Sequence, residues 1–158
     1  MSKNNIQLKL RPIQSLLSGI DLPSIEYCLD STQVFMFSAI TWNRHKIHYD
    51  QVEAKKEGHQ SVLIQRGLIG NLFTRFIGEL FLDVFIQRLE WKVFSSAFPG
   101  DRLSCSCEIK EPLSDSLEQI VLVLTIINQD QQEISKATAV VREINEVDLI
   151  RPLTKSYE

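Results

Sequence analysis

The chain has 158 residues, a length that suits one domain with its own hydrophobic core. Its hydrophobic fraction of 44% and charged fraction of 23% are ordinary for a globular protein, and the net charge of −3, without a basic run, disfavours nucleic acid as the main partner. No apolar run is long enough to cross a bilayer, and the N-terminus lacks the apolar core of a signal peptide, so we expect a cytoplasmic protein without a membrane partner.

The three cysteines do not predict a disulfide framework. Cys105 and Cys107 stand two apart in a strand-like run, so their side chains point to the same face. No second Cys or His pair matches them elsewhere in the sequence. We therefore expect buried, reduced thiols and no metal site.

The first part of the chain predicts one strand and one helix before residue 41. Residues 11–19 are compatible with either a short helix or an ordered entry segment, and residues 24–29 are typical of a first strand. Asp30 or Ser31 is placed to cap a helix over residues 32–40.

A second short helix is predicted after residue 50. Asp50 and Glu53 have the spacing of an N-cap and its N3 partner, which predicts a helix that begins at about Gln51. Gly58 is a natural stop for that helix.

Residues 68–82 predict a long buried helix. Eight apolar residues recur there at helical spacing: Leu68, Ile69, Leu72, Phe73, Phe76, Ile77, Leu80 and Phe81. So broad an apolar stripe indicates a helix packed against a sheet.

The second half predicts four strands, at residues 84–94, 102–110, 120–127 and 133–143. The first alternates with Phe85, Leu89, Trp91 and Val93 on one face. The third is almost continuously apolar, which is typical of a central strand covered on both faces.

These elements predict an α+β architecture in which an antiparallel meander wraps one long central helix. No internal repeat or linker is visible, so we expect a single domain over residues 1–158 with a core at about 23–144.

Residues 41–50, T-W-N-R-H-K-I-H-Y-D, contain two of the three histidines, His45 and His48. His48 lies just before the predicted helix start, where the helix dipole disfavours imidazolium and favours a neutral base. A surface or capping role for this histidine is the alternative.

Residues 39–50 read A-I-T-W-N-R-H-K-I-H-Y-D and resemble a motif, A-L-T-F-N-x-H-x-I-H-Y-D, of the MaoC-like hydratase/dehydratase family. The motif belongs to the branch that includes mesaconyl-CoA hydratase-like proteins and the mitochondrial 3-hydroxyacyl-thioester dehydratase. The turn F-P-G-D at residues 98–101 matches the family's F-x-G-D, and the resemblance covers roughly residues 26–143. It implies a hot-dog fold, in which a sheet wraps one central helix.

The resemblance also implies an activity, the interconversion of 2-enoyl and 3-hydroxyacyl thioesters of coenzyme A or acyl carrier protein, without a cofactor. In the R-specific hydratases of the family the signature is G-D-x-N-P-x-H, whose catalytic Asp and His correspond to Asn43 and His48. His48 would then be the base and Asn43 would orient water or the 3-hydroxyl, unless Asn43 only closes a turn with its side chain. The Gly67 N–H would face the thioester carbonyl.

The substrate-binding residues expected beside this pair are His45, Gln65, Arg66 and Gly67. The family usually reads V-H-G where this chain reads Gln65-Arg66-Gly67, and an Arg in the His place points to an altered substrate or to loss of activity. Two other functions therefore remain: a non-catalytic acyl-binding or partner subunit, and a hot-dog thioesterase.

A thioesterase of this fold usually relies on an Asp or Glu near the long helix, and Glu79 and Asp83 lie too far along it. Members of the family pair two units, so we expect a homodimer or a heterodimer with a homologous subunit.

Overall fold

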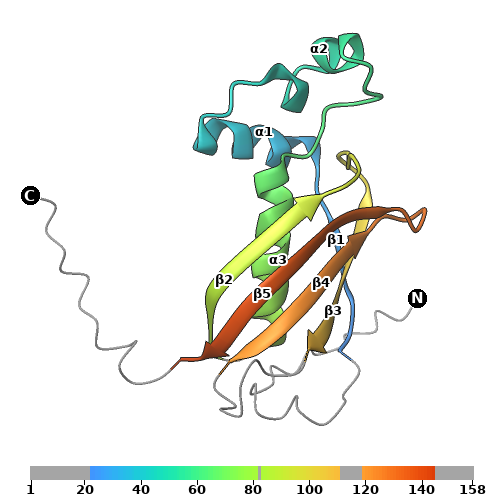
Figure 1. Cartoon of the computed structure of the whole chain (residues 1–158). Coiled ribbons are helices and arrows are strands. Elements are labelled where there is room, and N and C mark those ends of the chain that lie inside the picture. Colours follow the sequence, from blue (N-terminus) through green and yellow to red (C-terminus); the bar gives the residue numbers. More distant parts are fainter. Residues whose placement is uncertain (1–21, 82, 111–118, 145–158) are drawn as a thin grey trace, which may run out of the picture.

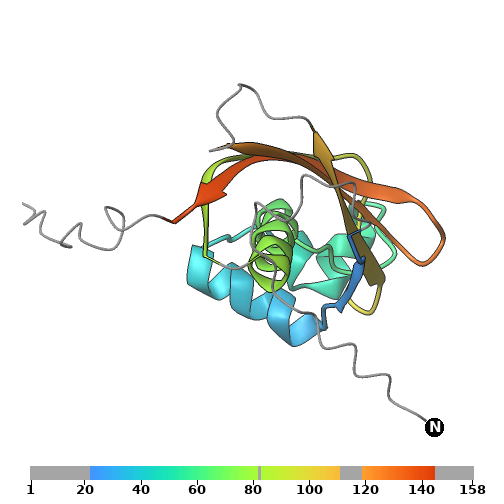
Figure 2. The same cartoon turned by 90° about the horizontal axis from the view of Figure 1, so that it is seen from below.

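The computed structural model describes residues 22–81, 83–110 and 119–144; the segment 11–19 lies outside them. A five-stranded antiparallel sheet curves around one long helix, α3 (Figures 1 and 2). The strands are β1 (Ile25–Cys28), β2 (Val84–Val93), β3 (Arg102–Lys110), β4 (Ile120–Ile127) and β5 (Glu133–Glu143). This arrangement confirms the predicted α+β hot-dog fold.

The sheet order is β1-β3-β4-β5-β2, so the predicted meander is only partly right. β3, β4 and β5 pair in sequence, but β2 pairs with β5 and not with the strand that follows it. The short strand β1 pairs with β3 at the opposite edge. Residue alternation shows which face of a strand is buried, but it does not show which strand lies beside it.

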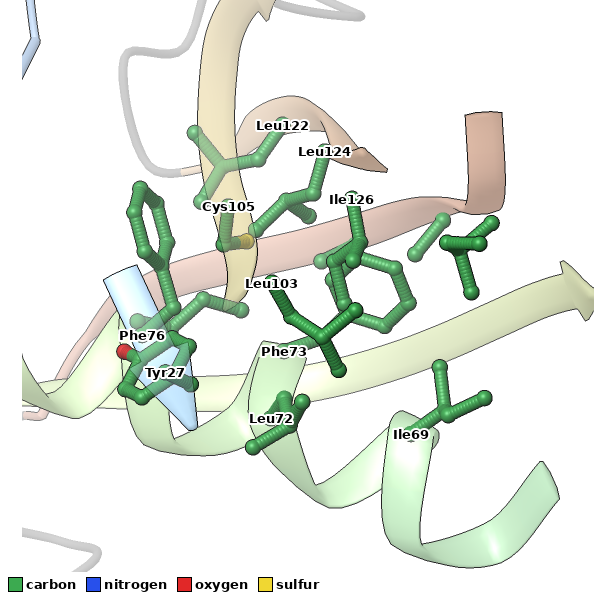
Figure 3. Close-up of a cluster of buried hydrophobic side chains, with 14 of the residues drawn as sticks. Tyr27, Ile69, Leu72, Phe73, Phe76, Leu103, Cys105, Leu122, Leu124 and Ile126 are labelled. Atoms are coloured by element: carbon green, nitrogen blue, oxygen red, sulfur yellow. The ribbon is translucent and has the colours of Figure 1, made fainter. Parts of the chain in front are cut away.

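Helix α3 spans Arg66–Leu80 and begins and ends two residues earlier than predicted. It begins there because Gln65 is extended, and it ends there because Phe81 has returned to an extended conformation. Its apolar stripe packs against the concave face of the sheet, where Phe73 and Phe76 are fully buried (Figure 3).

A register shift in β2 between Ile86 and Arg88 corrects the predicted alternation of this strand. Leu89 and Val93 pack on the core as predicted, but Phe85 lies on the other side of the irregularity. Phe85 is 44% exposed, and the Arg142 guanidinium lies over its ring at 4.7 Å from the centroid. At a β-bulge the side chains before and after the extra residue change places between the two faces of the sheet, and no pattern in this sequence predicts the bulge.

The prediction that residues 120–127 are covered on both faces is wrong. Burial alternates along β4 between fully buried residues and residues that are partly exposed. Figure 2 shows the described helices on the concave side of the sheet, which leaves the outer face of β4 without a helix over it.

The paired cysteines lie on one face of β3, as predicted. Cys105 is fully buried and Cys107 is half-buried, and both are free. Burial raises the pKa of both thiols, so they are protonated at neutral pH.

The segment between β1 and α3 folds over one end of α3 (Figure 1). It contains α1 (Ser31–Thr41), a 3₁₀ turn η2 (Lys46–His48) and α2 (Gln51–Lys56). Asp30 caps α1 in a reciprocal capping box with Gln33, and Asp50 accepts hydrogen bonds from the first N–H groups of α2. Both predicted helices are confirmed.

No helix of the described residues is long and apolar enough to cross a membrane.

Candidate functional site

A cavity of about 780 Å³ lies at the N-terminal end of α3. Its walls come from three segments that are distant in sequence: the end of α1 with η2, the residues around the start of α3, and the residues that follow β2. The lining residues are Phe37, Thr41, Asn43, His45, Ile47, His48, Leu63, Ile64, Gln65, Arg66, Gly67, Ile69, Val93, Phe94, Ser95, Ser96 and Ala97.

The cavity brings together all six residues that the sequence singled out. They are Asn43, His45, His48, Gln65, Arg66 and Gly67. Apolar side chains form most of the remaining wall, so the cavity combines apolar and polar side chains, as many small-molecule sites do.

His48 is held by the backbone of a neighbouring segment of the cavity wall. Its Nδ1–H donates to the Leu63 carbonyl at 2.8 Å, and the Leu63 N–H donates to the Ile47 carbonyl at 3.0 Å. Because a carbonyl oxygen can only accept, the proton of the neutral ring lies on Nδ1 and the lone pair on Nε2. The geometry therefore leaves Nε2 available as a base.

Burial lowers the pKa of His48 below its ordinary value of 6.5. The hydrogen bond to the Leu63 carbonyl opposes this shift, and the nearby His45 adds to it. The imidazole is therefore neutral at pH 7.

Asn43 lies two residues beyond the end of α1, after the C-cap Trp42, whose backbone is in the left-handed region at φ 54°. Its N–H donates to the Ser38 carbonyl at 2.9 Å, and its Oδ1 accepts from the His45 N–H at 3.1 Å. The side chain thus closes a turn, as one reading of the sequence predicted. This leaves its Nδ2 as a donor for a ligand.

His45 is more exposed than His48. Its Nε2 lies 3.3 Å from Glu57 Oε1 at the end of α2, and its ring stands edge-on to that of His48 with centroids 5.9 Å apart. The imidazole therefore both tethers α2 and forms part of the cavity wall.

Gln65 is 2% exposed and connects α1 to the start of α3. Its Nε2 donates to the Val34 carbonyl and to Ser38 Oγ, both at 2.7 Å. Its Oε1 is buried without a hydrogen-bond partner among the described residues. The amide group is therefore committed to α1, although the residue lines the cavity.

Arg66 and Gly67 are the first two residues of α3. A Cβ on Gly67 would lie 3.2 Å from the Phe37 ring, so a glycine permits close packing of α1 on α3 here. The first N–H groups of a helix have no partner within it and carry its positive dipole end, which suits a negatively charged oxygen.

Several residues of the wall carried no signal in the sequence. The Leu63 carbonyl is a backbone group, so no residue pattern identifies it. Phe37 reads as an ordinary core residue, and the segment 94–97 reads as the end of a strand and a turn. A hydrogen bond from the Ile64 N–H to the Ala97 carbonyl, 2.9 Å long, holds this segment against the residues before α3.

The carboxylate of Glu79 is engaged away from the cavity. It accepts hydrogen bonds from Tyr27 Oη at 3.0 Å and from Arg75 Nε at 2.7 Å. Among the described residues no group of three or more His, Cys, Asp or Glu side chains could hold a metal ion.

The model of the hydroxyacyl-thioester dehydratase type 2 family matches residues 18–99, more than half of the chain. No curated protein matches the sequence. Similar solved structures include R-hydratase PhaJ1 from Pseudomonas aeruginosa, with a TM-score of 0.75 and 16% identity over 85% of this chain and 86% of that one.

Two further structures share the fold. A chain of the ChsH1–ChsH2 complex from Mycobacterium tuberculosis has a TM-score of 0.71 and 16% identity over 80% of this chain and 97% of that one. The MaoC-like dehydratase from Rhodospirillum rubrum has a TM-score of 0.63 and 14% identity over 77% of this chain and 89% of that one. The chain thus has the hot-dog fold of the MaoC-like hydratases and belongs to the hydroxyacyl-thioester dehydratase type 2 family.

Proposed function

We propose that the protein interconverts 3-hydroxyacyl and 2-enoyl thioesters of coenzyme A or acyl carrier protein, with His48 as the base. The observation that carries this proposal is the neutral, half-buried His48, whose Nδ1–H is held by the Leu63 carbonyl in a cavity next to Asn43. Membership of the dehydratase family supports the same reaction class.

In the direction of dehydration, His48 Nε2 removes the proton from C2 of the 3-hydroxyacyl thioester. Negative charge then develops on the thioester oxygen, where the Gly67 N–H and the dipole of α3 stabilise it. The same imidazolium returns the proton to the departing 3-hydroxyl, so a double bond and one water molecule form. Hydration follows these steps in reverse.

Asn43 cannot titrate, so His48 carries the proton in both steps. The Nδ2 of Asn43 donates a hydrogen bond to the oxygen that leaves or attacks. Its Oδ1 is bound to the His45 N–H, which fixes the orientation of the amide.

The test is hydration of crotonyl-CoA, followed as the loss of enoyl-thioester absorbance. We expect His48→Ala to lose turnover by about 100-fold or more. His59→Ala is the matched control, since His59 is the one histidine outside the cavity lining. Equal turnover in the wild type and His48→Ala would move the base elsewhere.

The second candidate is a non-catalytic acyl-binding or partner subunit, and Arg66 in the place of the usual His favours it. A binder keeps its affinity for a saturated acyl-CoA in His48→Ala, and it shows no turnover in the wild type. Titration calorimetry with butyryl-CoA beside the turnover assay separates the two functions.

We also propose that the chain pairs with itself or with a homologous subunit. Four large apolar side chains are more than half exposed on and just after α1: Phe35 (55%), Met36 (53%), Ile40 (80%) and Trp42 (76%). Such a patch is typical of an interaction surface. Pairing with another subunit is also supported by the ChsH1–ChsH2 complex, in which a chain of the same fold occurs in a complex.

A further inference from the structure

The charge on the cavity wall is positive. Among the described residues that line the cavity, Arg66 alone carries a permanent charge, and none is an Asp or Glu. The nearby carboxylate of Glu57 is bound to His45, and that of Glu90 lies 3.5 Å from Arg88 Nε. This positive wall stands out in a chain whose net charge is −3.

The Arg66 guanidinium is exposed and has no hydrogen bond or ion pair within residues 22–81, 83–110 and 119–144. Its backbone is held, because the Arg66 carbonyl accepts from Trp91 Nε1 at 3.1 Å. Arg75, further along the same helix, is by contrast paired with Glu79 at 2.7 Å. A ligand can therefore bind Arg66 without breaking an internal ion pair.

The place of Arg66 in α3 indicates which part of a substrate it meets. Arg66 directly precedes Gly67, whose N–H faces the thioester carbonyl in the proposed function, and the inference rests on that function. The guanidinium can therefore reach groups a few bonds from the carbonyl. The phosphates of either carrier are separated from the thioester by the whole pantetheine arm, which is longer than an arginine side chain.

We propose that the site selects thioesters whose acyl group carries a second, anionic group, a carboxylate, which the Arg66 guanidinium binds. Arginine matches a carboxylate with two parallel N–H···O bonds, and such charge-assisted bonds are stronger than neutral ones. The apolar wall then holds the carbon chain between the carboxylate and the thioester.

The experiment compares hydration of glutaconyl-CoA, which ends in a carboxylate, with that of its methyl ester, which has the same carbon skeleton without the charge. We expect the wild type to favour the carboxylate in kcat/KM by about 10- to 100-fold. Arg66→Gln should abolish this preference by slowing glutaconyl-CoA alone, and Arg66→Lys should restore part of it. Arg102→Gln, at an exposed site outside the cavity, is the matched control.

Equal rates for the two substrates in the wild type, or an equal loss on both in Arg66→Gln, would overturn the inference. The N-acetylcysteamine thioesters of the same acyl groups lack the carrier phosphates. If the effect of Arg66→Gln persists with them, the carboxylate is the partner; if it disappears, Arg66 binds the carrier and the inference is wrong.

Absence of turnover with every substrate would contradict the proposed function and leave the inference testable by binding. Titration calorimetry with glutaryl-CoA and its methyl ester needs no chemical step. Tighter binding of the carboxylate by about tenfold or more, lost in Arg66→Gln, supports the inference, and equal binding overturns it.

Discussion

A single backbone contact of His48 determines which form of its imidazole is present. The Leu63 carbonyl determines which ring nitrogen carries the proton, and burial keeps the ring neutral. A histidine on an open surface would titrate near its ordinary pKa, and its proton could lie on either ring nitrogen.

The first prediction concerns the pH dependence of turnover. In the proposed function the neutral form of His48 is the active one, and its pKa is lowered. Activity should therefore rise with pH along an acid limb that lies below pH 6.5 and should be level at neutral pH. His45→Gln removes a charge that lowers the pKa of His48, so the limb should move to higher pH. A profile of kcat/KM against pH measures both. An acid limb at or above 6.5 in the wild type would contradict the assignment.

The second prediction concerns the buried amide of Gln65. Gln65→Glu replaces the N–H donors by oxygens that face the Val34 carbonyl, so we expect the free energy of unfolding to fall by about 3 kcal/mol or more. Gln65→Leu loses the two hydrogen bonds but also removes the unpartnered Oε1, and should cost only about 1–2 kcal/mol. Urea denaturation of the two variants measures the difference. Equal midpoints would show that the α1 contact carries little of the stability.

The sequence identified the polar residues of the site better than it identified their surroundings. Asn43 and His48 stand in a motif, and side chains with special chemistry are visible in a pattern of letters. Tertiary packing determines the contacts of three other groups: the Leu63 carbonyl, the Gln65 Oε1 and the Ala97 carbonyl. Local patterns contain no information about such contacts between distant segments.

The apolar stripe of α3 predicted the helix, but it placed both the start and the end of the helix two residues too late. The stripe could not show that Gln65 and Phe81 are extended, since helix ends depend on local backbone conformation. Similarly, the alternation of β2 predicted a strand but not the register shift that turns Phe85 to the other face.

The third prediction uses two glycines of α3. A Cβ on Gly70 would lie 2.6 Å from the Trp91 ring, so Gly70→Ala must displace the indole and disturb its bond to the Arg66 carbonyl. We expect a loss of about 1–3 kcal/mol of stability. Gly78 has nothing within 4 Å of an added Cβ, so Gly78→Ala should stabilise the protein by about 0.5–1 kcal/mol. Thermal denaturation of both variants tests the contrast, and shifts of the same sign would contradict it.

The local patterns of the sequence predicted an α+β fold, and the family resemblance implied the hot-dog fold. The order of the strands in the sheet could not be predicted from either. Five strands around one helix follow from local periodicity, while the pairing of β2 with β5 depends on contacts between residues about 50 positions apart, such as Leu89 and Ala139.

The fourth prediction is an assembly of two subunits. A chain of 18.2 kDa should sediment at about twice that mass, because the exposed apolar side chains of α1 need a partner. Ile40→Glu should weaken the assembly, and Ser106→Glu on the outer face of the sheet should leave it unchanged. Analytical ultracentrifugation measures the mass. A stable monomer that turns over substrate would contradict pairing, and an inactive monomer would point to a homologous partner subunit.

The group that holds the His48 ring belongs to the backbone of Leu63 and not to its side chain. Every amino acid has a carbonyl, so substitutions at position 63 can enlarge or narrow the cavity while the tautomer of His48 is preserved. Proline is the exception, since it removes the N–H that ties this residue to Ile47. Within that limit, the shape of the cavity can change in evolution while the protonated nitrogen of the His48 ring stays the same.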